Sequence, residues 1–179
     1  MKTLTIRGIE IGAGRPKIIA PIVGATAEEV LDKSRELAGL PIDAVEWRAD
    51  FFQALPQQEQ TVSLLRQMRK ILGEKILLFT IRTKKDGGEV DLTMDQYTAL
   101  NAAAAKSGQV DLIDVEVFSG DDVVRKNLEN IHQSGVAVVA SNHDFDATPT
   151  EEELVSRLRK MQELGADILK IAVMPTCMA

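Results

Sequence analysis

The sequence has little cysteine and little histidine. Of its 179 residues, only Cys177 is a cysteine, and the two histidines are His132 and His143. A single cysteine excludes a disulfide bond within the chain, which is typical of a reducing compartment. The few histidines and the one cysteine show no metal-ligand spacing, so we expect no metal centre.

Long apolar runs and basic clusters are also missing. No apolar stretch approaches the roughly 18 residues that a membrane span needs, and Met1–Arg7 lacks the apolar core of a signal peptide, so we expect a cytoplasmic protein without a membrane partner. The net charge of −6 and the pI near 5.0 argue against nucleic acid as a partner. The densest basic group, Arg66, Arg69 and Lys70, falls on a predicted helix and is interpreted as a solvated face. No GxGxxG or P-loop pattern is present.

The residues that are present alternate between strand-like and helix-like segments. After a predicted hairpin (4–6 and 9–11), apolar runs predict strands at 17–23, 44–48, 76–82, 112–117, 136–141 and 168–173. Helical spacing predicts helices at 27–38, 62–72, 94–106, 122–134 and 151–164. Thr26 with Glu29, and Thr150 with Glu153, resemble the residues that begin helices.

Strand-helix-strand units that repeat along the chain predict a parallel sheet, either open or closed into a barrel. Alternate residues of a strand face opposite ways, so Glu46 shares a face with Arg48, and Asp114 shares one with Glu116. Central strands of an open sheet are covered on both faces and should be apolar on both. We therefore expect an α/β fold of the (β/α)8 TIM-barrel type, as a single domain spanning 1–179 with about six of the eight βα units and an N-terminal β-hairpin.

Lys170 lies in the middle of the apolar run 168–173 and is the most informative of the charged residues. A lysine in apolar surroundings loses proton affinity and can attack a carbonyl group as a neutral amine. His143 follows the preceding strand and would lie beside it, and Asp86 in the Gly-containing loop 82–89 is a candidate to accept the ring N–H of His143. The same parity argument brings seven ionisable groups into one lumen: Glu46, Arg48, Arg82, Asp114, Glu116, His143 and Lys170.

Each of these residues alone also has a purely structural interpretation. A histidine at a strand end often bonds its own loop, and His132 near a helix end fits a surface residue favoured by the helix dipole. This interpretation predicts three structural ion pairs: Arg48 with Glu46, Arg82 with Asp114, and Lys170 with Glu116. The shared parity on several strands favours a common site.

Five short motifs in order resemble type I 3-dehydroquinate dehydratase over nearly the whole chain. They are Glu46-Trp47-Arg48-Ala49-Asp50, Phe79-Thr80-Ile81-Arg82-Thr83, Gly87-Gly88-Glu89, Ser141-Asn142-His143-Asp144-Phe145 and Lys170-Ile171-Ala172. Any one of these motifs alone would be weak, but five in register are specific.

The resemblance implies a homodimeric barrel that dehydrates 3-dehydroquinate to 3-dehydroshikimate without metal or cofactor. Lys170 would form the imine with the substrate ketone, and His143 would be the general base and then the general acid. The substrate-contacting positions would be Glu46, Arg48 and Arg82.

Two departures from the family pattern affect these expectations. The family usually has Glu at the position of Asp86, so we expect His143 to be oriented less firmly and the rate to be lower. The family also continues for about two more βα units, so residues 175–179 resemble a cut within a loop, and the first and last strands should have unpaired edges. The alternatives are a class I aldolase-like barrel acting on another carbonyl compound, and an inactive partial barrel.

Overall fold

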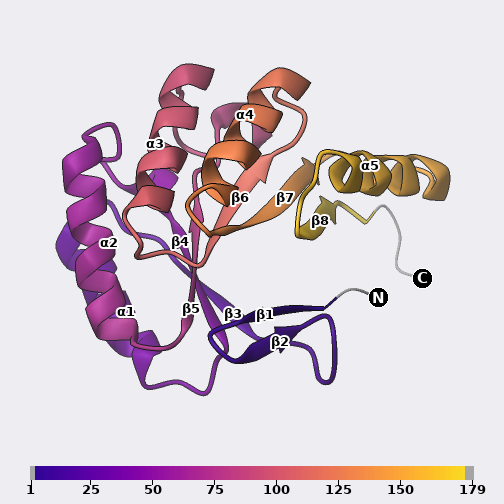
Figure 1. Ribbon diagram of the computed structural model, residues 1–179. Coiled ribbons are helices and arrows are strands. Elements are labelled where there is room, and N and C mark those ends of the chain that lie inside the picture. The colour runs from indigo at the N-terminus through magenta and orange to yellow at the C-terminus, as the bar shows by residue number, and fades with distance from the viewer. Residues whose placement is uncertain (1–2, 176–179) are drawn as a thin grey trace.

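The computed structural model describes residues 3–175 as a curled parallel sheet with helices on its outer side (Figure 1). Within these residues six strands pair in chain order, from β3 to β8, and every pairing is parallel. A doubly wound sheet would reverse its strand order, whereas a barrel keeps it. The expected barrel-type fold is therefore confirmed, and β3 and β8 are the two edges of the described sheet. Residues 176–179 lie outside the described residues. They include Cys177 and most of the segment 175–179 in which a cut was expected.

The elements have the following bounds. The strands are β1 (Leu4–Ile6), β2 (Ile9–Ile11), β3 (Ile19–Ile22), β4 (Ala44–Arg48), β5 (Ile76–Thr80), β6 (Leu112–Glu116), β7 (Ala137–Asp144) and β8 (Ile168–Val173). The helices are α1 (Ala27–Ala38), α2 (Gln58–Leu72), α3 (Met94–Lys106), α4 (Asp121–His132) and α5 (Glu151–Glu163), with short 3-10 turns at Ala49–Phe51 and Lys84–Asp86.

Two boundaries differ from the sequence prediction in a way that matters. Helix α2 begins four residues before the predicted start at Val62, because its first turn is polar and carries little apolar periodicity. Strand β7 continues past Ser141 to Asp144, and His143 pairs with Ala172 of β8. The backbone ladder continues where the apolar pattern stops, so His143 lies within a strand rather than after it.

The inner face of the sheet begins with an apolar floor. Ile6, Ile9 and Ile11 of the β1–β2 hairpin pack against inward side chains near the amino ends of the strands. The buried members of this cluster are Ala44, Ile76, Leu78, Leu112 and Val139. The hairpin, which lies beneath the sheet in Figure 1, therefore covers the amino end of the lumen.

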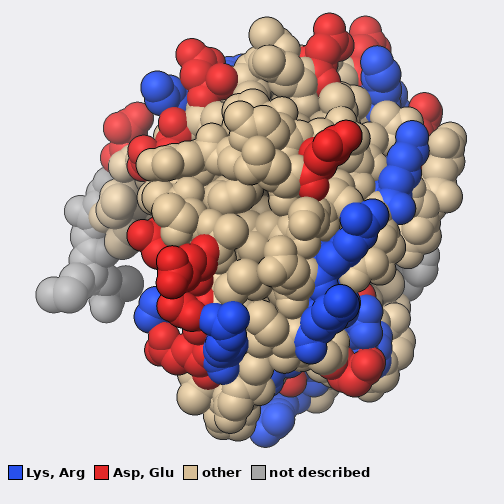
Figure 2. Space-filling model, turned by 90° about the vertical axis from the view of Figure 1, so that its left-hand side faces the viewer, with Lys and Arg blue, Asp and Glu red and all other residues tan. Residues whose placement is uncertain are grey.

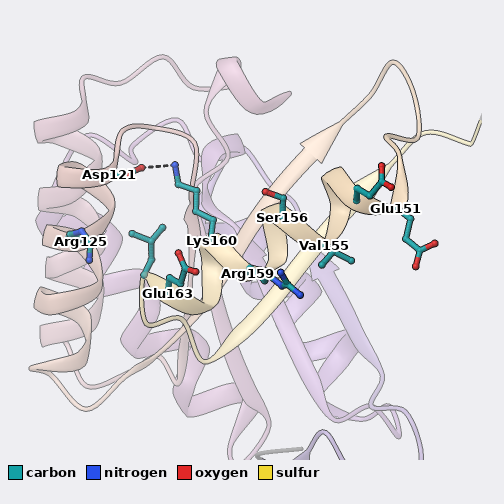
Figure 3. A pocket seen from close by; sticks show the side chains of 10 residues that line it. Asp121, Arg125, Glu151, Val155, Ser156, Arg159, Lys160 and Glu163 are labelled. Atoms are coloured by element: carbon teal, nitrogen blue, oxygen red, sulfur yellow. Dashed lines mark ion pairs between the residues drawn. The ribbon is translucent and has the colours of Figure 1, made fainter.

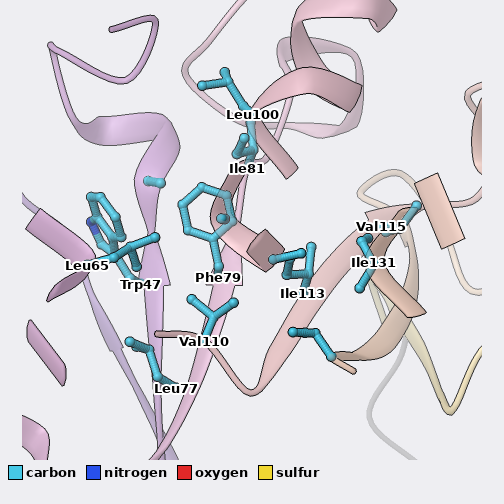
Figure 4. Packing of buried hydrophobic residues seen from close by; sticks show 14 of the residues in the cluster. Trp47, Leu65, Leu77, Phe79, Ile81, Leu100, Val110, Ile113, Val115 and Ile131 are labelled. Atoms are coloured by element: carbon cyan, nitrogen blue, oxygen red, sulfur yellow. The ribbon is translucent and has the colours of Figure 1, made fainter. Parts of the chain in front are cut away.

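The outer face of the same strands forms the main core with the helices (Figure 4). Trp47 on β4 packs edge-on against Phe79 on β5, with their ring centroids 5.6 Å apart, and both side chains are fully buried. Burying a large apolar side chain contributes about 1.5–3 kcal/mol. The alternation predicted from the sequence thus separates an apolar outer face from an inner face that becomes charged toward the carboxyl ends.

The outer surface of α1 and α2 is highly charged. Figure 2 shows that this side of the molecule carries both charge signs, with a run of Lys and Arg along one side. Arg66 and Lys70 are exposed as predicted, but the prediction for Arg69 was wrong. Its guanidinium bonds Asp111 at 2.6 Å and three backbone carbonyls, because the helix places it over the loop before β6. Within residues 3–175 no helix is both long and apolar enough to cross a membrane.

Candidate active site

Arg82, just after β5, is the centre of a buried polar network. Its Nη1 donates to Glu116 at 3.2 Å and to Ser141 Oγ at 3.0 Å, and its Nη2 donates to Asp114 at 2.8 Å. Ser141 Oγ donates to the same Asp114 oxygen at 2.7 Å. The ion pair of Arg82 with Asp114 is present, and the network joins the carboxyl ends of β5, β6 and β7.

The loop after β5 adds a carboxylate to this network. Asp86 Oδ2 lies 3.1 Å from Arg82 Nη1 and 2.7 Å from His143 Nδ1. A bond at Nδ1 leaves Nε2 as the ring nitrogen that can exchange a proton with a bound molecule. Although Asp86 is one methylene shorter than Glu, the 3-10 turn Lys84–Asp86 brings it within full hydrogen-bond distance of the ring.

Lys170 faces the lumen from β8, next to the strand that carries His143. In the strand register Lys170 pairs with Ser141, and His143 is the next inward residue along β7. Ordinary strand spacing and rise put the α-carbons of Lys170 and His143 about 8 Å apart. Lys170 also lines a lumen cavity of about 450 Å³ that includes Glu46.

The ion-pair alternatives for Lys170 and Arg48 do not describe the structure. Glu116, the suggested partner of Lys170, bonds Arg82 and Thr83 instead. Arg48 forms two 2.8 Å bonds with Asp50, and not a pair with Glu46, because the 3-10 turn after β4 folds Asp50 back toward it.

Glu46 belongs to the lumen through a different contact. Its carboxylate accepts a 2.8 Å hydrogen bond from Thr80 Oγ1 on the neighbouring strand. The side chain is half-buried, and one of its surfaces lines the cavity that Lys170 shares. Glu46 is therefore accessible to a molecule bound in the lumen.

Burial changes the proton affinity of several groups in the network. Burial raises the pKa of Glu116, although the hydrogen bonds from Thr83 and the charge of Arg82 oppose this. Burial alone would lower the pKa of Arg82, but Asp114, Glu116 and Asp86 together raise it. Burial and the nearby carboxylates raise the pKa of Tyr97, whose hydroxyl accepts from the Glu116 N–H at 3.2 Å. The network therefore holds a permanent cation, Arg82, beside one carboxylate of raised pKa, Glu116.

Phe145 and Gly87 show what the sequence argument missed. The Phe145 ring stacks nearly parallel to His143 at 5.8 Å between centroids. A side chain at Gly87 would come within 2.4 Å of Phe145, and the backbone there has a φ of +81°. Gly87 and Gly88 were named only as part of a motif of the resemblance, whereas in the structure the missing side chain of Gly87 makes room for the Phe145 ring against His143.

The remaining sequence expectations concern metal ligands and His132. Within residues 3–175 no group of three His, Cys, Asp or Glu side chains is placed to hold a metal ion. His132 lies on the surface of α4 and, in addition, its Nε2 lies 2.9 Å from Asp167. It is remote from the lumen network.

A second cavity, of about 800 Å³, lies on the outer side between α4 and α5 (Figure 3). Its lining is highly charged and includes the ion pair of Lys160 with Asp121 at 2.7 Å. Arg125, Arg159 and Glu163 add charges of both signs. We place the candidate site in the lumen, where Lys170, the imidazole of His143 and the buried carboxylates are, and not in this groove.

A curled βα sheet that gathers lysine, histidine and carboxylates at the carboxyl ends of its strands defines an enzyme of the βα-barrel class. A family model described as type I 3-dehydroquinase matches residues 18–179, and the chain belongs to this family. A curated 3-dehydroquinate dehydratase of Salmonella agona is 50% identical over 175 residues, which cover 98% of this chain and 69% of the relative. The dehydratase of Syntrophotalea carbinolica is 47% identical over the same shares.

Solved structures agree with this assignment. The type I 3-dehydroquinate dehydratase of Clostridium difficile, solved with covalently modified comenic acid, has a TM-score of 0.97 and 43% identity, over 98% of this chain and 69% of that one. The likeness to a putative deoxyribose-phosphate aldolase of Toxoplasma gondii, at 13% identity over 88% of this chain and 66% of that one, has a TM-score of 0.61 and shows only the shared fold. The aldolase-like alternative is therefore not favoured.

Proposed function

We propose that the lumen site dehydrates 3-dehydroquinate to 3-dehydroshikimate through an imine on Lys170. The observation that carries this proposal is the placement of Lys170 and a carboxylate-bound His143 on neighbouring strands of one lumen. The names of the relatives, 3-dehydroquinate dehydratases, support the choice of substrate.

The first step is covalent. The neutral amine of Lys170 attacks the ketone carbon and a C–N bond forms, and the ketone oxygen leaves as water after it takes one proton from the amine nitrogen and a second from solvent. The resulting protonated imine withdraws electrons from the adjacent carbon. The covalently modified ligand reported for the Clostridium difficile relative supports covalent chemistry in this family.

The second stage is proton transfer. His143 Nε2 takes the proton from the carbon next to the imine, and the hydroxyl on the following carbon leaves as water with that proton. Water then hydrolyses the imine and releases Lys170. Asp86 at Nδ1 keeps the ring in one orientation and stabilises its protonated form.

We assign substrate contacts to Glu46, Arg48 and Arg82. Glu46 lines the Lys170 cavity, and the half-buried Arg48 keeps its charge because the hydrogen bonds that it donates to Asp50 raise its pKa. Arg82 is held by four protein groups, so its contribution is a fixed positive charge rather than a mobile clamp.

Borohydride trapping tests the nucleophile. With 3-dehydroquinate present, reduction should add one ligand mass to the peptide that contains Lys170, since borohydride reduces the imine to a stable amine. Lys170→Met should lose the adduct, while Lys85→Met, which removes an exposed lysine of the neighbouring loop, should keep it. An adduct on another lysine, or an equal adduct with a sugar phosphate, would contradict the assignment. Enone absorbance in the ultraviolet, measured on the same protein, separates an active chain from an inactive partial barrel.

We also propose that the chain is one domain that forms a homodimer in the cytoplasm. The resemblance to the family supports the dimer, and the single cysteine supports a reducing compartment. Multi-angle light scattering should give a mass of twice 19.6 kDa. A mass of 19.6 kDa over a wide range of protein concentration would contradict the dimer.

A further inference from the structure

Thr83 is the point at which the Asp86 loop is attached to the sheet. Its side chain is buried, and both of its polar donors reach the same carboxylate on β6. The Thr83 N–H donates to Glu116 Oε1 at 2.8 Å, and Thr83 Oγ1 donates to Glu116 Oε2 at 2.8 Å. Both carboxylate oxygens of Glu116 therefore accept hydrogen bonds from the first residue of the loop.

The rest of the loop is built on the Thr83 carbonyl. That oxygen accepts hydrogen bonds from the N–H of Asp86 at 3.0 Å and the N–H of Gly88 at 2.8 Å. A Cβ atom at Gly88 would lie 1.9 Å from the Arg82 carbonyl oxygen. The backbone at Gly88 therefore packs directly against Arg82, where the loop begins. The position of Asp86 is thus fixed relative to Thr83.

The contacts end at the imidazole. Asp86 Oδ2 lies 2.7 Å from His143 Nδ1, while the bonds of Glu116 go to Thr83 and Arg82 and not to His143. Burying a carboxylate is costly, and a group that only filled space would not need a charge. The pKa of Glu116 is raised by burial and by the charge of Asp86, and it is lowered by the hydrogen bonds from Thr83 and the charge of Arg82.

We propose that Glu116 is a positioning residue that, through Thr83, fixes the loop of Asp86 and thereby holds the ring of His143. The effect on turnover rests on the proposed function of His143. The effect on the ring itself does not, so the two are measured separately.

Thr83→Val tests the link, because it removes the Oγ1 bond but keeps size, charge and the backbone bond. Its matched control is Thr61→Val on α2, which removes an equally buried hydroxyl bond to the carbonyl of Leu55, away from the lumen. Thr83→Ser keeps the hydroxyl and should restore the wild-type behaviour. Glu116→Gln is the second variant if Thr83→Val does not fold.

Nitrogen NMR of the two histidine rings at alkaline pH reports the orientation without any substrate. We expect His143 in the wild type to be in one tautomer with the proton on Nδ1, and a mixture of tautomers in Thr83→Val and Glu116→Gln. His132 on α4 is the internal standard, and its signals should stay unchanged. An unchanged His143 spectrum in both variants would overturn the proposal.

Kinetics on the same proteins test the consequence for catalysis. In Thr83→Val, kcat should fall about tenfold with KM within about twofold, because the base is misoriented rather than removed. Borohydride trapping on Lys170 should be retained. Parallel loss of trapping and turnover, or an equal loss in Thr61→Val, would mean general damage and would also overturn the proposal. If no protein turns over 3-dehydroquinate but the NMR result holds, only the substrate assignment fails.

Discussion

At the scale of single residues, Arg82 shows how much one cation organises. Asp86, Asp114, Glu116 and Ser141 all accept hydrogen bonds from its guanidinium. Removing one partner of a buried ion pair leaves an uncompensated charge, which is far more costly than losing an exposed pair. Arg82 therefore makes the acidic lumen possible, whatever it contributes to substrate binding.

The raised pKa of Glu116 predicts that its contribution to the unfolding free energy depends on pH. Its pKa in the folded protein lies above the ordinary 4.5, so the folded state binds that proton more tightly than the unfolded state does. The stabilisation from protonated Glu116 is complete below about pH 4.5 and is lost as the pH rises through the higher folded-state pKa. The unfolding free energy of the wild type minus that of Glu116→Gln should therefore fall as the pH rises from about 4.5 into the neutral range.

Urea unfolding at several pH values in that range measures this difference. Arg82, Asp86 and Tyr97 are present in both proteins, so most of their own titration cancels. A difference that is independent of pH, or that grows with pH, would contradict the role of burial at Glu116.

Residue-scale partners were the hardest part of the site to predict. Strand parity correctly placed Glu46 and Lys170 in the lumen, because alternation depends only on the backbone. It did not predict that Arg48 would bond Asp50, since that depends on a 3-10 turn with no apolar periodicity. The same applies to Arg69, whose charge suggested solvent although its bonds go to the backbone.

At the scale of elements, the loop between β5 and α3 contributes as much as any strand. It contains the 3-10 turn Lys84–Asp86, and Thr83 forms an isolated bridge with Val90. Its two glycines are needed for different reasons: Gly87 for the contact with Phe145 and a positive φ, and Gly88 for the close approach to Arg82. The loop is a built part of the site and not a simple connection.

Gly88→Ala should therefore destabilise the fold. The added Cβ meets the Arg82 backbone, and relieving such overpacking costs about 1–3 kcal/mol. Gly39→Ala is the matched control, because its Cβ would meet nothing within 4 Å and its φ is −82°. Gly39→Ala should stabilise the protein by about 0.4–1 kcal/mol, because alanine lowers the conformational entropy of the unfolded chain. Urea midpoints measure both changes, and equal stability of Gly88→Ala and wild type would refute the close approach.

The ends of helices and strands were predictable where they depend on residues close in the sequence. The capping box of Thr26 with Glu29 forms as the sequence predicted, because it is a local interaction. Thr150 likewise accepts from the Glu153 N–H at 3.3 Å. The end of β7 was not predictable, since its last residues are polar and are held by the ladder to β8, which is distant in the sequence.

At the scale of the whole molecule, the repeat of strand and helix was enough to predict the barrel-type sheet. Each unit buries its outer face under its own helix, so the pattern repeats without long-range information. The packing of the hairpin on the amino end depended on distant partners, and the sequence indicated the hairpin but not its place.

The lining of the lumen changes from apolar at the amino ends of the strands to charged at their carboxyl ends. Its floor is hydrocarbon from the hairpin and from Ile168, and Lys170 is the next inward residue of β8 toward the charged rim. A hydroxylated ring that enters from the rim keeps polar partners until it reaches the amine, and going deeper would strip its hydration without replacement. The apolar floor therefore closes the amino end of the lumen and also makes any position of a polar molecule beyond Lys170 costly in solvation.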